Sequence, residues 1–282
     1  MLDSGQAGRY SLSLYMRVYN AMPCRLRRIV VAAILAVPGV FIAAPVRAAD
    51  VPNIAAASDL QFVLQDIAAQ FTRATGRQVR IAFGSSGNFR RQIAEGAPFE
   101  LFLSADAAYV DALAQEGRTV DAGAVYAIGR LALYTPRGSP IVADAELRDL
   151  ERALNDGRLV KFAIANPEHA PYGRAARQVL MHAGMWSRIE PRLVLGENVS
   201  QAAQFVASGA AQAGIIAYSL TRAPALAERG TAVMLPATAH GPLLQKMVLL
   251  KGAGATARAF RDFLDAPTAR ALFERYGFQQ SP

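Results

Sequence analysis

The sequence is poor in the side chains that carry thiol and metal chemistry. It has one cysteine, Cys24, and three histidines among 282 residues. Cys24 precedes an apolar segment near the N-terminus, so the chain beyond it has no thiol for a disulfide, a nucleophile or a thiolate metal site. The histidines, His169, His182 and His240, lack metal-ligand spacing. With 52% hydrophobic residues, the chain can bury enough apolar surface for one large or two medium domains without cross-links.

Net positive charge is also small beyond the N-terminal segment. The whole chain has 30 basic and 22 acidic residues, but six arginines and one aspartate lie in residues 1–48. Residues 49–282 therefore carry a net charge of only +3, which is little for a surface that binds nucleic acid. We expect no nucleic-acid partner.

Residues 1–48 have the layout of a secretory signal peptide. A basic cluster at residues 25–28 precedes an apolar run at residues 29–44, and Val46 and Ala48 suit the two cleavage positions. A retained membrane anchor, as in an anchored interaction protein, is the alternative. The run is shorter than the ~20 residues that a spanning helix needs, and it contains Pro38. The sequence therefore predicts export to the periplasm.

Short apolar strands alternate with helices from residue 51 onward. The pattern predicts strands at residues 53–57, 78–83, 101–104, 130–135, 160–165, 213–217 and 246–250, and helices at residues 60–75, 90–95, 107–115, 174–183, 200–208, 255–264 and 268–276. Such alternation is typical of an α/β fold with mainly parallel sheets flanked by helices. We expect two lobes, residues 49–130 plus 236–282 and residues 131–235, joined by two crossings with a ligand cleft between them.

Four clusters of small, hydroxyl or glycine residues stand at predicted strand-to-helix junctions. They are residues 57–59, 84–88, 171–173 and 197–199. The carboxyl ends of parallel strands meet at one edge of a sheet, and the helices that follow begin with unpaired N–H groups and a positive dipole end. The clusters therefore predict a site that holds an anion without lysine or arginine.

Each candidate residue also has a structural alternative. Ser58 either caps the helix that follows or donates to the ligand. Asp59 would repel a dianion with its carboxylate, so we expect at most a contribution from its backbone N–H, with the side chain turned toward the helix start. Ser86 lies in a glycine-flanked loop that is either a concave anion site or a solvent loop. Tyr172 is either a hydroxyl donor or a packed loop aromatic, and Val199 offers only its backbone N–H.

Five motifs, in order along the chain, resemble those of the periplasmic molybdate-binding proteins of ABC transporters. They are AAASDL at residues 55–60, FGSSGN at 83–88, QIAEGAP at 92–98 with LFLSAD at 101–106, NPEH at 166–169 and FERYGF at 273–278. The resemblance implies a two-lobed periplasmic binding protein fold of type II. It implies a protein that closes on molybdate or tungstate and delivers it to a membrane permease, with no cofactor and no enzymatic activity. We expect a monomer.

The resemblance also implies which residues hold the oxyanion. Ser58 and Ser86 would donate their hydroxyls, and Tyr172 and Val199 would donate backbone N–H groups. In part of the family, the residue at Asp59 and a tyrosine hydroxyl, here that of Tyr172, also contact the ligand.

Tyr218 departs from the family pattern. Some members have a ligand tyrosine one residue earlier, at the position of Ala217. A shift of one residue turns a strand-end side chain to the opposite face, so Tyr218 is a doubtful ligand.

Two other functions remain open from the sequence. The first is binding of another oxyanion, such as sulfate or thiosulfate. The second is an exported serine hydrolase that uses Ser58 or Ser86 with His169. The loop Gly84-Ser-Ser-Gly87 lacks the Gly-x-Ser-x-Gly spacing of a sharp nucleophile turn, which disfavours the hydrolase.

Overall fold

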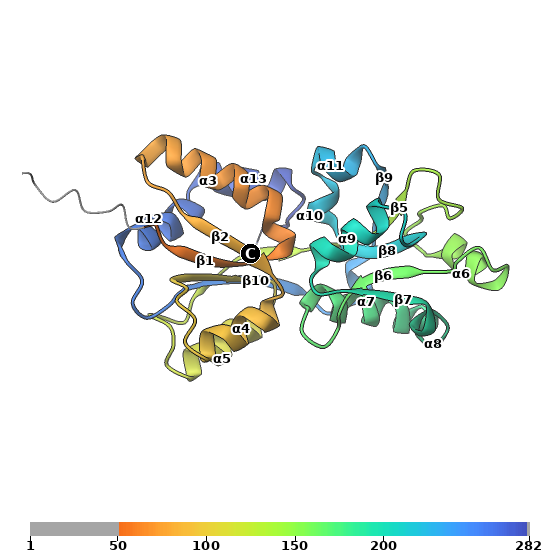
Figure 1. Cartoon of the computed structure of the whole chain (residues 1–282), viewed down its shortest axis with the longest axis horizontal. Coiled ribbons are helices and arrows are strands. Elements are labelled where there is room, and N and C mark those ends of the chain that lie inside the picture. The colour runs from red at the N-terminus through yellow and green to blue at the C-terminus, as the bar shows by residue number, and fades with distance from the viewer. Residues whose placement is uncertain (1–50, 281–282) are drawn as a thin grey trace, which may run out of the picture. The chain divides into compact units, whose positions relative to one another are not determined.

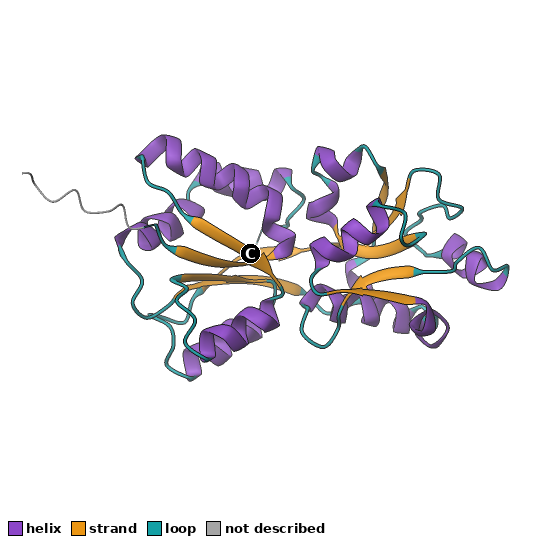
Figure 2. Cartoon of the chain, viewed as in Figure 1, coloured by secondary structure: helices purple, strands orange, loops and turns teal. Residues whose placement is uncertain are grey.

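The alternating strands and helices form two five-stranded sheets. The computed structural model describes residues 51–280. The signal peptide expected at residues 1–48 lies outside this range. Each sheet has helices on both of its faces (Figures 1 and 2).

The first sheet has the strand order β2-β1-β3-β10-β4. Its strands are β1 (Asn53–Ala57), β2 (Arg80–Gly84), β3 (Leu101–Ser104), β4 (Ala124–Gly129) and β10 (Leu243–Leu249). Strand β1 is parallel to β2 and β3, whereas β10 is antiparallel to β3 and β4. One face is covered by α3 (Gln61–Thr75), α12 (Ala255–Leu264) and α13 (Pro267–Arg275), and the other by α4 (Ser86–Ala94) and α5 (Ala107–Gln115) (Figure 1).

The second sheet has the order β7-β6-β8-β5-β9. Its strands are β5 (Leu131–Pro136), β6 (Phe162–Ala165), β7 (Leu193–Gly196), β8 (Ala213–Ala217) and β9 (Gly230–Met234). Strand β6 is parallel to β7 and β8, and β5 is antiparallel to β8 and β9. The helices on this sheet include α7 (Pro171–His182) and α9 (Val199–Ala207) (Figure 1). The shorter helices are α6 (Arg148–Asn155), α8 (Trp186–Ile189), α10 (Tyr218–Thr221) and α11 (Pro224–Ala227).

Two segments connect the sheets. Arg130 alone separates β4 from β5, and residues 235–242 separate β9 from β10. The strands next to these crossings are the antiparallel ones. Strands β5 and β10 are entered directly from the other sheet, without the crossover helix that a parallel neighbour requires. The expected α/β class is confirmed, with mixed sheets in place of mainly parallel ones.

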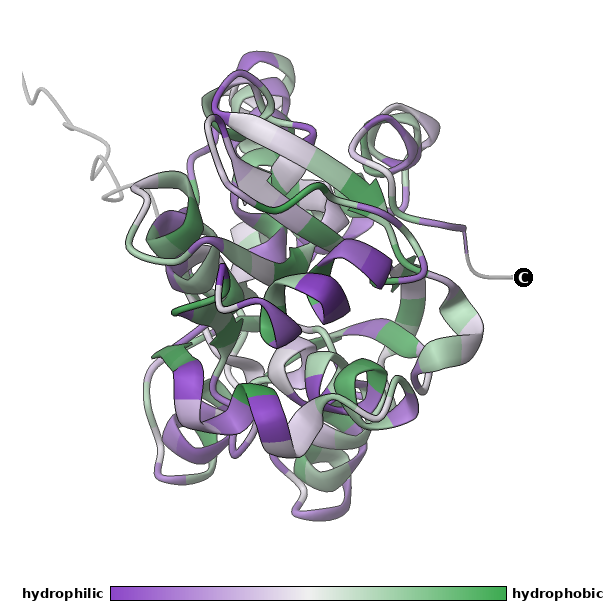
Figure 3. Cartoon of the chain, turned by 90° about the vertical axis from the view of Figure 1, so that its right-hand side faces the viewer, coloured by the Kyte–Doolittle hydropathy of each residue, from purple (hydrophilic) through white to green (hydrophobic). Residues whose placement is uncertain are grey.

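The core follows from continuous apolar strands. Every residue of β3, β6 and β8 is buried, as expected for strands covered on both faces. Phe71 of α3 packs edge to face against Phe260 and Phe263 of α12, with ring centroids 5.1 and 5.5 Å apart. The helices carry both hydrophilic and hydrophobic residues, as helices that bury one side do (Figure 3). Within residues 51–280, no helix is both long enough and apolar enough to cross a membrane.

Helix α4 begins earlier than the sequence predicts. It starts at Ser86, with Ser85 as its extended N-cap, whereas the expected start is residue 90. Gly87 and Asn88 are weak helix formers, so their segment resembles a loop in the sequence although it forms the first turn. The glycine-serine loop is therefore shorter than expected, and Ser86 lies at a helix N-terminus.

Candidate functional site

Three helix N-termini and one short turn converge on a small cavity. The turn is the 3₁₀-helix η1 (Ser58–Leu60), which follows β1, and the helices are α4, α7 and α9. The space left in the cavity is only about 10 Å³, and it is lined by Ala57, Ser58, Asp59, Gly84, Ser85, Ser86, Ala105, Ala170, Pro171, Tyr172, Asn198 and Val199. This is far below the roughly 300–1,000 Å³ of sites for drug-sized ligands, so the cavity suits only a ligand of a few atoms.

The structure brings together five of the six sequence-predicted site residues. Ser58, Asp59, Ser86, Tyr172 and Val199 all line the cavity, with the first three next to the first sheet and the last two next to the second. None of the lining residues in the described chain is a lysine or an arginine. Positive potential at this cavity comes from helix N-termini, whose first-turn N–H groups have no intrahelical acceptor.

Two of the three serines that line the cavity, Ser58 and Ser86, accept hydrogen bonds from backbone N–H groups. Ser58 Oγ accepts from the N–H of Ser200 at 3.3 Å, and Ser86 Oγ accepts from the N–H of Ala105 at 3.0 Å. Ser58 does not cap η1 or α3, so the capping alternative is wrong. Because each oxygen accepts a fixed N–H, its own O–H proton is left to donate toward a ligand.

Asp59 does not have the orientation expected from the sequence. Its side chain is buried, with 1% of the residue exposed, and it makes no capping bond at the helix start. Asp59 Oδ2 instead accepts from the Tyr172 hydroxyl at 2.9 Å and from Gln245 Nε2 at 2.7 Å. The expected turn toward the helix start is wrong, because two buried donors face the carboxylate from β10 and α7.

Burial controls the protonation of the Asp59 carboxyl group. Burial raises the pKa of Asp59 to about 7, against the opposing effect of the hydrogen bonds from Tyr172 and Gln245. Burial and the negative charge of Asp59 hold the pKa of Tyr172 well above its usual value, so that hydroxyl stays protonated and donates. Asp59 Oδ1 is buried without a hydrogen-bond partner in the described structure.

Gln245 is a member of this cluster that the sequence analysis missed. It is fully buried on β10 and lies within the run Leu-Leu-Gln-Lys-Met-Val-Leu. A single amide in an otherwise apolar strand was the available signal, because a buried amide needs partners.

Loops on the two sides of the cavity also bond to each other. Ser85 Oγ donates to the carbonyl oxygen of His169 at 2.6 Å, and the N–H of Gly87 donates to the same oxygen at 3.0 Å. A Cβ atom at Gly87 would lie 2.5 Å from that oxygen, so glycine is required for this approach. The loop before α4 and the loop before α7 therefore meet in this structure.

A family model described as bacterial extracellular solute-binding protein matches residues 52–279. The chain belongs to this family. This solute-binding protein is 40% identical over 217 residues to molybdate-binding protein ModA of Rhodobacter capsulatus, a match that covers 76% of this chain and 82% of the relative. It is 37% identical to molybdate-binding protein ModA of Azotobacter vinelandii, over 84% of this chain and 92% of the relative.

A solved structure supports the same relation. The fold matches the Azotobacter vinelandii periplasmic molybdate-binding protein with a TM-score of 0.73 and 30% identity, over 82% of this chain and all of that one. The resemblance inferred from the sequence motifs and the two-lobed fold are thereby confirmed.

The solute-binding family is inconsistent with the hydrolase alternative. The relatives named above are binding proteins. The serine that contacts the imidazole of His169 is Ser85, at 2.9 Å from Nδ1, and not Ser58 or Ser86. Ser85 already donates its proton to the His169 carbonyl oxygen. No described group of three His, Cys, Asp or Glu side chains in this solute-binding protein could hold a metal ion.

Tyr218 lies apart from the other candidates in this solute-binding protein. It is not among the residues that line the cavity. Its ring instead packs on Gly277, where an added Cβ would lie 2.6 Å from the ring, and the guanidinium of Arg222 lies 5.8 Å from the ring centroid. The doubt raised by its shifted position in the sequence agrees with this placement.

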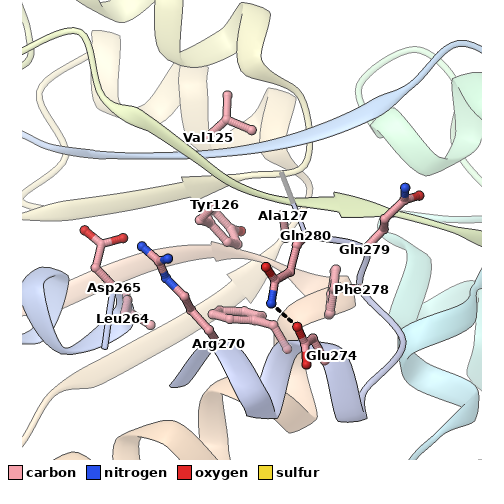
Figure 4. A pocket seen from close by; sticks show the side chains of 11 residues that line it. Val125, Tyr126, Ala127, Leu264, Asp265, Arg270, Glu274, Phe278, Gln279 and Gln280 are labelled. Carbon is pink, nitrogen blue, oxygen red and sulfur yellow. Dashed lines mark hydrogen bonds between the residues drawn. The ribbon is translucent and has the colours of Figure 1, made fainter. Parts of the chain in front are cut away.

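A further cavity of this solute-binding protein lies beside α13 and contains none of the predicted site residues. Figure 4 shows Tyr126, Arg270 and Glu274 around it, together with the C-terminal segment at Gln279 and Gln280. The hydroxyl of Tyr126 donates to Gln245 Oε1 at 3.1 Å. Tyr126 therefore links the wall of this cavity to the buried cluster at Asp59.

Proposed function

We propose that this protein binds molybdate or tungstate in the periplasm and delivers it to the membrane permease of an ABC transporter. It does so as an exported monomer without a cofactor. The lobes formed by residues 49–130 plus 236–282 and by residues 131–235 close around the anion. The observation that carries the proposal is the small cavity formed by three helix N-termini and two oriented hydroxyls without a basic side chain.

The donors assigned to the oxyanion are two hydroxyls and two backbone groups. Ser58 and Ser86 donate their hydroxyl protons, and Tyr172 and Val199 donate N–H groups from the first turns of α7 and α9. The Tyr172 hydroxyl serves Asp59, so this residue contributes through its backbone. Asp59 lines the cavity and is proposed to offer its backbone N–H.

This donor set favours an oxyanion that carries no proton. A protonated phosphate would bring a hydroxyl that needs an acceptor, whereas every group assigned to the ligand is a hydroxyl or N–H donor. Sulfate has the same charge as molybdate but is smaller. Donors that are fixed to helix starts and to β-strand ends cannot contract around it. We therefore expect discrimination against sulfate by size and against phosphate by hydrogen bonding.

Isothermal titration of the purified protein with molybdate, tungstate, sulfate and phosphate tests the proposal. We expect one-to-one binding of molybdate and tungstate and no heat from the other two anions. Binding of sulfate alone would assign the site to another oxyanion, and silence from all four would refute an oxyanion site.

Replacement of the two serines tests the assigned donors. Ser58→Ala and Ser86→Ala each remove one hydrogen bond to a charged ligand, which is worth roughly 1.5–3 kcal/mol, or about 10- to 150-fold in affinity. Ser208→Ala is the matched control, because the hydroxyl of this exposed serine bonds only the Phe205 carbonyl oxygen in the described structure. Unchanged affinity in both cavity variants would refute the site assignment.

A further inference from the structure

Gln245 occupies a position that the surrounding backbone is shaped to accommodate. The register of β10 against β4 shifts between Gln245 and Lys246, which marks a local irregularity of the ladder. Such irregularities re-aim side chains and often lie next to functional sites. On the neighbouring strand, a Cβ atom at Gly129 would lie 3.0 Å from Gln245 Nε2 and 2.3 Å from the Tyr172 hydroxyl. The glycine therefore leaves the space in which the amide and the phenol meet.

The hydrogen bonds of Gln245 fix which way its amide points. Its Oε1 accepts from the Tyr126 hydroxyl at 3.1 Å, so Nε2 faces the opposite side. Nε2 donates to Asp59 Oδ2 at 2.7 Å and lies 3.4 Å from the Tyr172 hydroxyl oxygen. Hydrogen bonds thus run in one direction from Tyr126 through Gln245 to Asp59.

The end of this network connects the two sheets. Gln245 and Asp59 lie on elements of the first sheet, whereas Tyr172 lies in the first turn of α7 against the second sheet. The bond from the Tyr172 hydroxyl to Asp59 Oδ2 therefore joins the two lobes at the cavity. Asp59 directly follows Ser58 in η1, so the orientation of the carboxylate and the placement of the Ser58 hydroxyl depend on the same turn.

We propose that Gln245 is a positioning residue of the oxyanion site. It holds Asp59 so that the carboxylate accepts the Tyr172 hydroxyl, which keeps the donors of the two lobes at the spacing that the bound anion requires. Gln245 does not line the cavity, so it acts through Asp59 and Tyr172 and not by contact with the ligand. This inference rests on the proposed function.

Two substitutions at this position separate positioning from simple packing. Gln245→Leu keeps most of the volume and removes both the donor and the acceptor. Gln245→Glu keeps the shape but replaces the donor with an acceptor that faces Asp59. We expect molybdate affinity to fall about 10-fold in Gln245→Leu and further in Gln245→Glu, because the Asp59 carboxylate loses one of its two donors. The loss should appear mainly as faster dissociation of molybdate.

A double variant provides a rescue that packing alone would not produce. Gln245→Glu combined with Asp59→Asn exchanges the amide and the carboxylate, so that residue 59 donates to residue 245 and the Tyr172 hydroxyl again has an acceptor. We expect the double variant to bind at least about 5-fold more tightly than Gln245→Glu, because opposed acceptors are replaced by a donor–acceptor pair.

Gln212→Leu is the matched control. The Gln212 side chain accepts from the N–H groups of Val160 and Lys161 and lies outside the cavity. We expect it to lower the unfolding temperature while the dissociation rate of molybdate stays at the wild-type value.

The measurements are titration calorimetry and stopped-flow dissociation of molybdate, with thermal unfolding of each variant. If molybdate dissociated from Gln245→Leu at the wild-type rate, or if the double variant showed no rescue, the positioning role would be overturned. Molybdate binding by the wild-type protein would still support the proposed function in that case. Absence of molybdate binding by the wild-type protein would overturn the proposed function itself.

Discussion

Two buried aspartates of the described chain, Asp59 and Asp149, have opposite surroundings. Asp149 lies in α6 of the second lobe, and its carboxylate accepts two bonds of 3.2 Å from Arg158 and one of 2.8 Å from the N–H of Val142. Asp59 lies at the cavity between the sheets, and its side-chain partners are a phenol and an amide. The hydrogen bonds from Arg158 lower the pKa of Asp149 to about 2, whereas burial raises the pKa of Asp59 to about 7.

The difference shows that neutral hydrogen-bond donors do not keep the pKa of a buried carboxyl low, as an arginine does. A guanidinium supplies opposite charge as well as hydrogen bonds, so the carboxylate of Asp149 stays ionised. A phenol and an amide supply hydrogen bonds only, which do not offset the loss of hydration at Asp59. The consequence suits an anion site. A carboxylate with reduced charge repels a neighbouring oxyanion less than a fully ionised one, and no guanidinium lines the cavity to bind it instead.

The largest expected effect is on the pH dependence of stability at Asp59. Its pKa in the folded protein lies above the unfolded value of 3.8. The native state therefore binds the proton more tightly, and its contribution to stability is fully present below about pH 4 and is lost as pH rises through about 7. Asp59→Asn removes this loss. We expect the ligand-free variant to gain on wild type between pH 4 and pH 8, by at most about 4 kcal/mol.

Urea unfolding of both proteins at intervals from pH 4.5 to 8 measures this effect. Asp262→Asn, at an exposed site on the first lobe, is the matched aspartate-to-asparagine control. If the free energy of unfolding changed with pH in the same way in wild type and in Asp59→Asn, the pKa of Asp59 would not be raised and the contrast with Asp149 would be wrong.

The second expected effect has the opposite sign. Asp149→Asn removes the charge that Arg158 pairs with, and hydrogen bonds to a charged group are worth about 1.5–3 kcal/mol. The folded pKa of Asp149 lies below the unfolded 3.8, so its contribution is present above about pH 4 and is lost as pH falls through about 2.

Urea unfolding of Asp149→Asn at pH 7 and at pH 3 checks this expectation. The variant should be less stable than wild type at pH 7, and the difference should shrink at pH 3. Asp156→Asn, which removes an exposed partner of the same arginine, should cost less. An equal loss in the two variants would mean that the burial of Asp149 adds nothing.

The site residues at strand-to-helix junctions could be predicted from the sequence. Ser58, Ser86, Tyr172 and Val199 stand at strand-to-helix junctions, and the topology of an α/β fold brings such junctions to one edge whatever the details of packing. Their common location therefore followed from local pattern and chain order. The early start of α4 did not, because the weak helix formers Gly87 and Asn88 occupy its first turn.

The environment of Asp59 depends on residues that are distant in the chain. Its carboxylate bonds Tyr172, 113 residues away, and Gln245, 186 residues away. The local sequence favoured a turn toward the helix start, which is the commonest use of an aspartate at that position. Only the tertiary structure, in which a β10 amide and an α7 phenol reach the same oxygen, determines the actual orientation.

The smallest expected effect concerns salt. The ion pair between Asp149 and Arg158 spans 3.2 Å with the arginine side chain 33% exposed, so solvent ions screen part of it. Raising NaCl from about 0.02 M to about 0.5 M should reduce the stability difference between wild type and Asp149→Asn by about 0.5 kcal/mol. The difference between wild type and Asp59→Asn at pH 8 should change less, because it arises from lost hydration in a buried site and not from an exposed ion pair. Unfolding of the three proteins at both salt concentrations measures the two differences, and equal changes would mean that Asp59 is coupled to a charge that its neutral partners do not reveal.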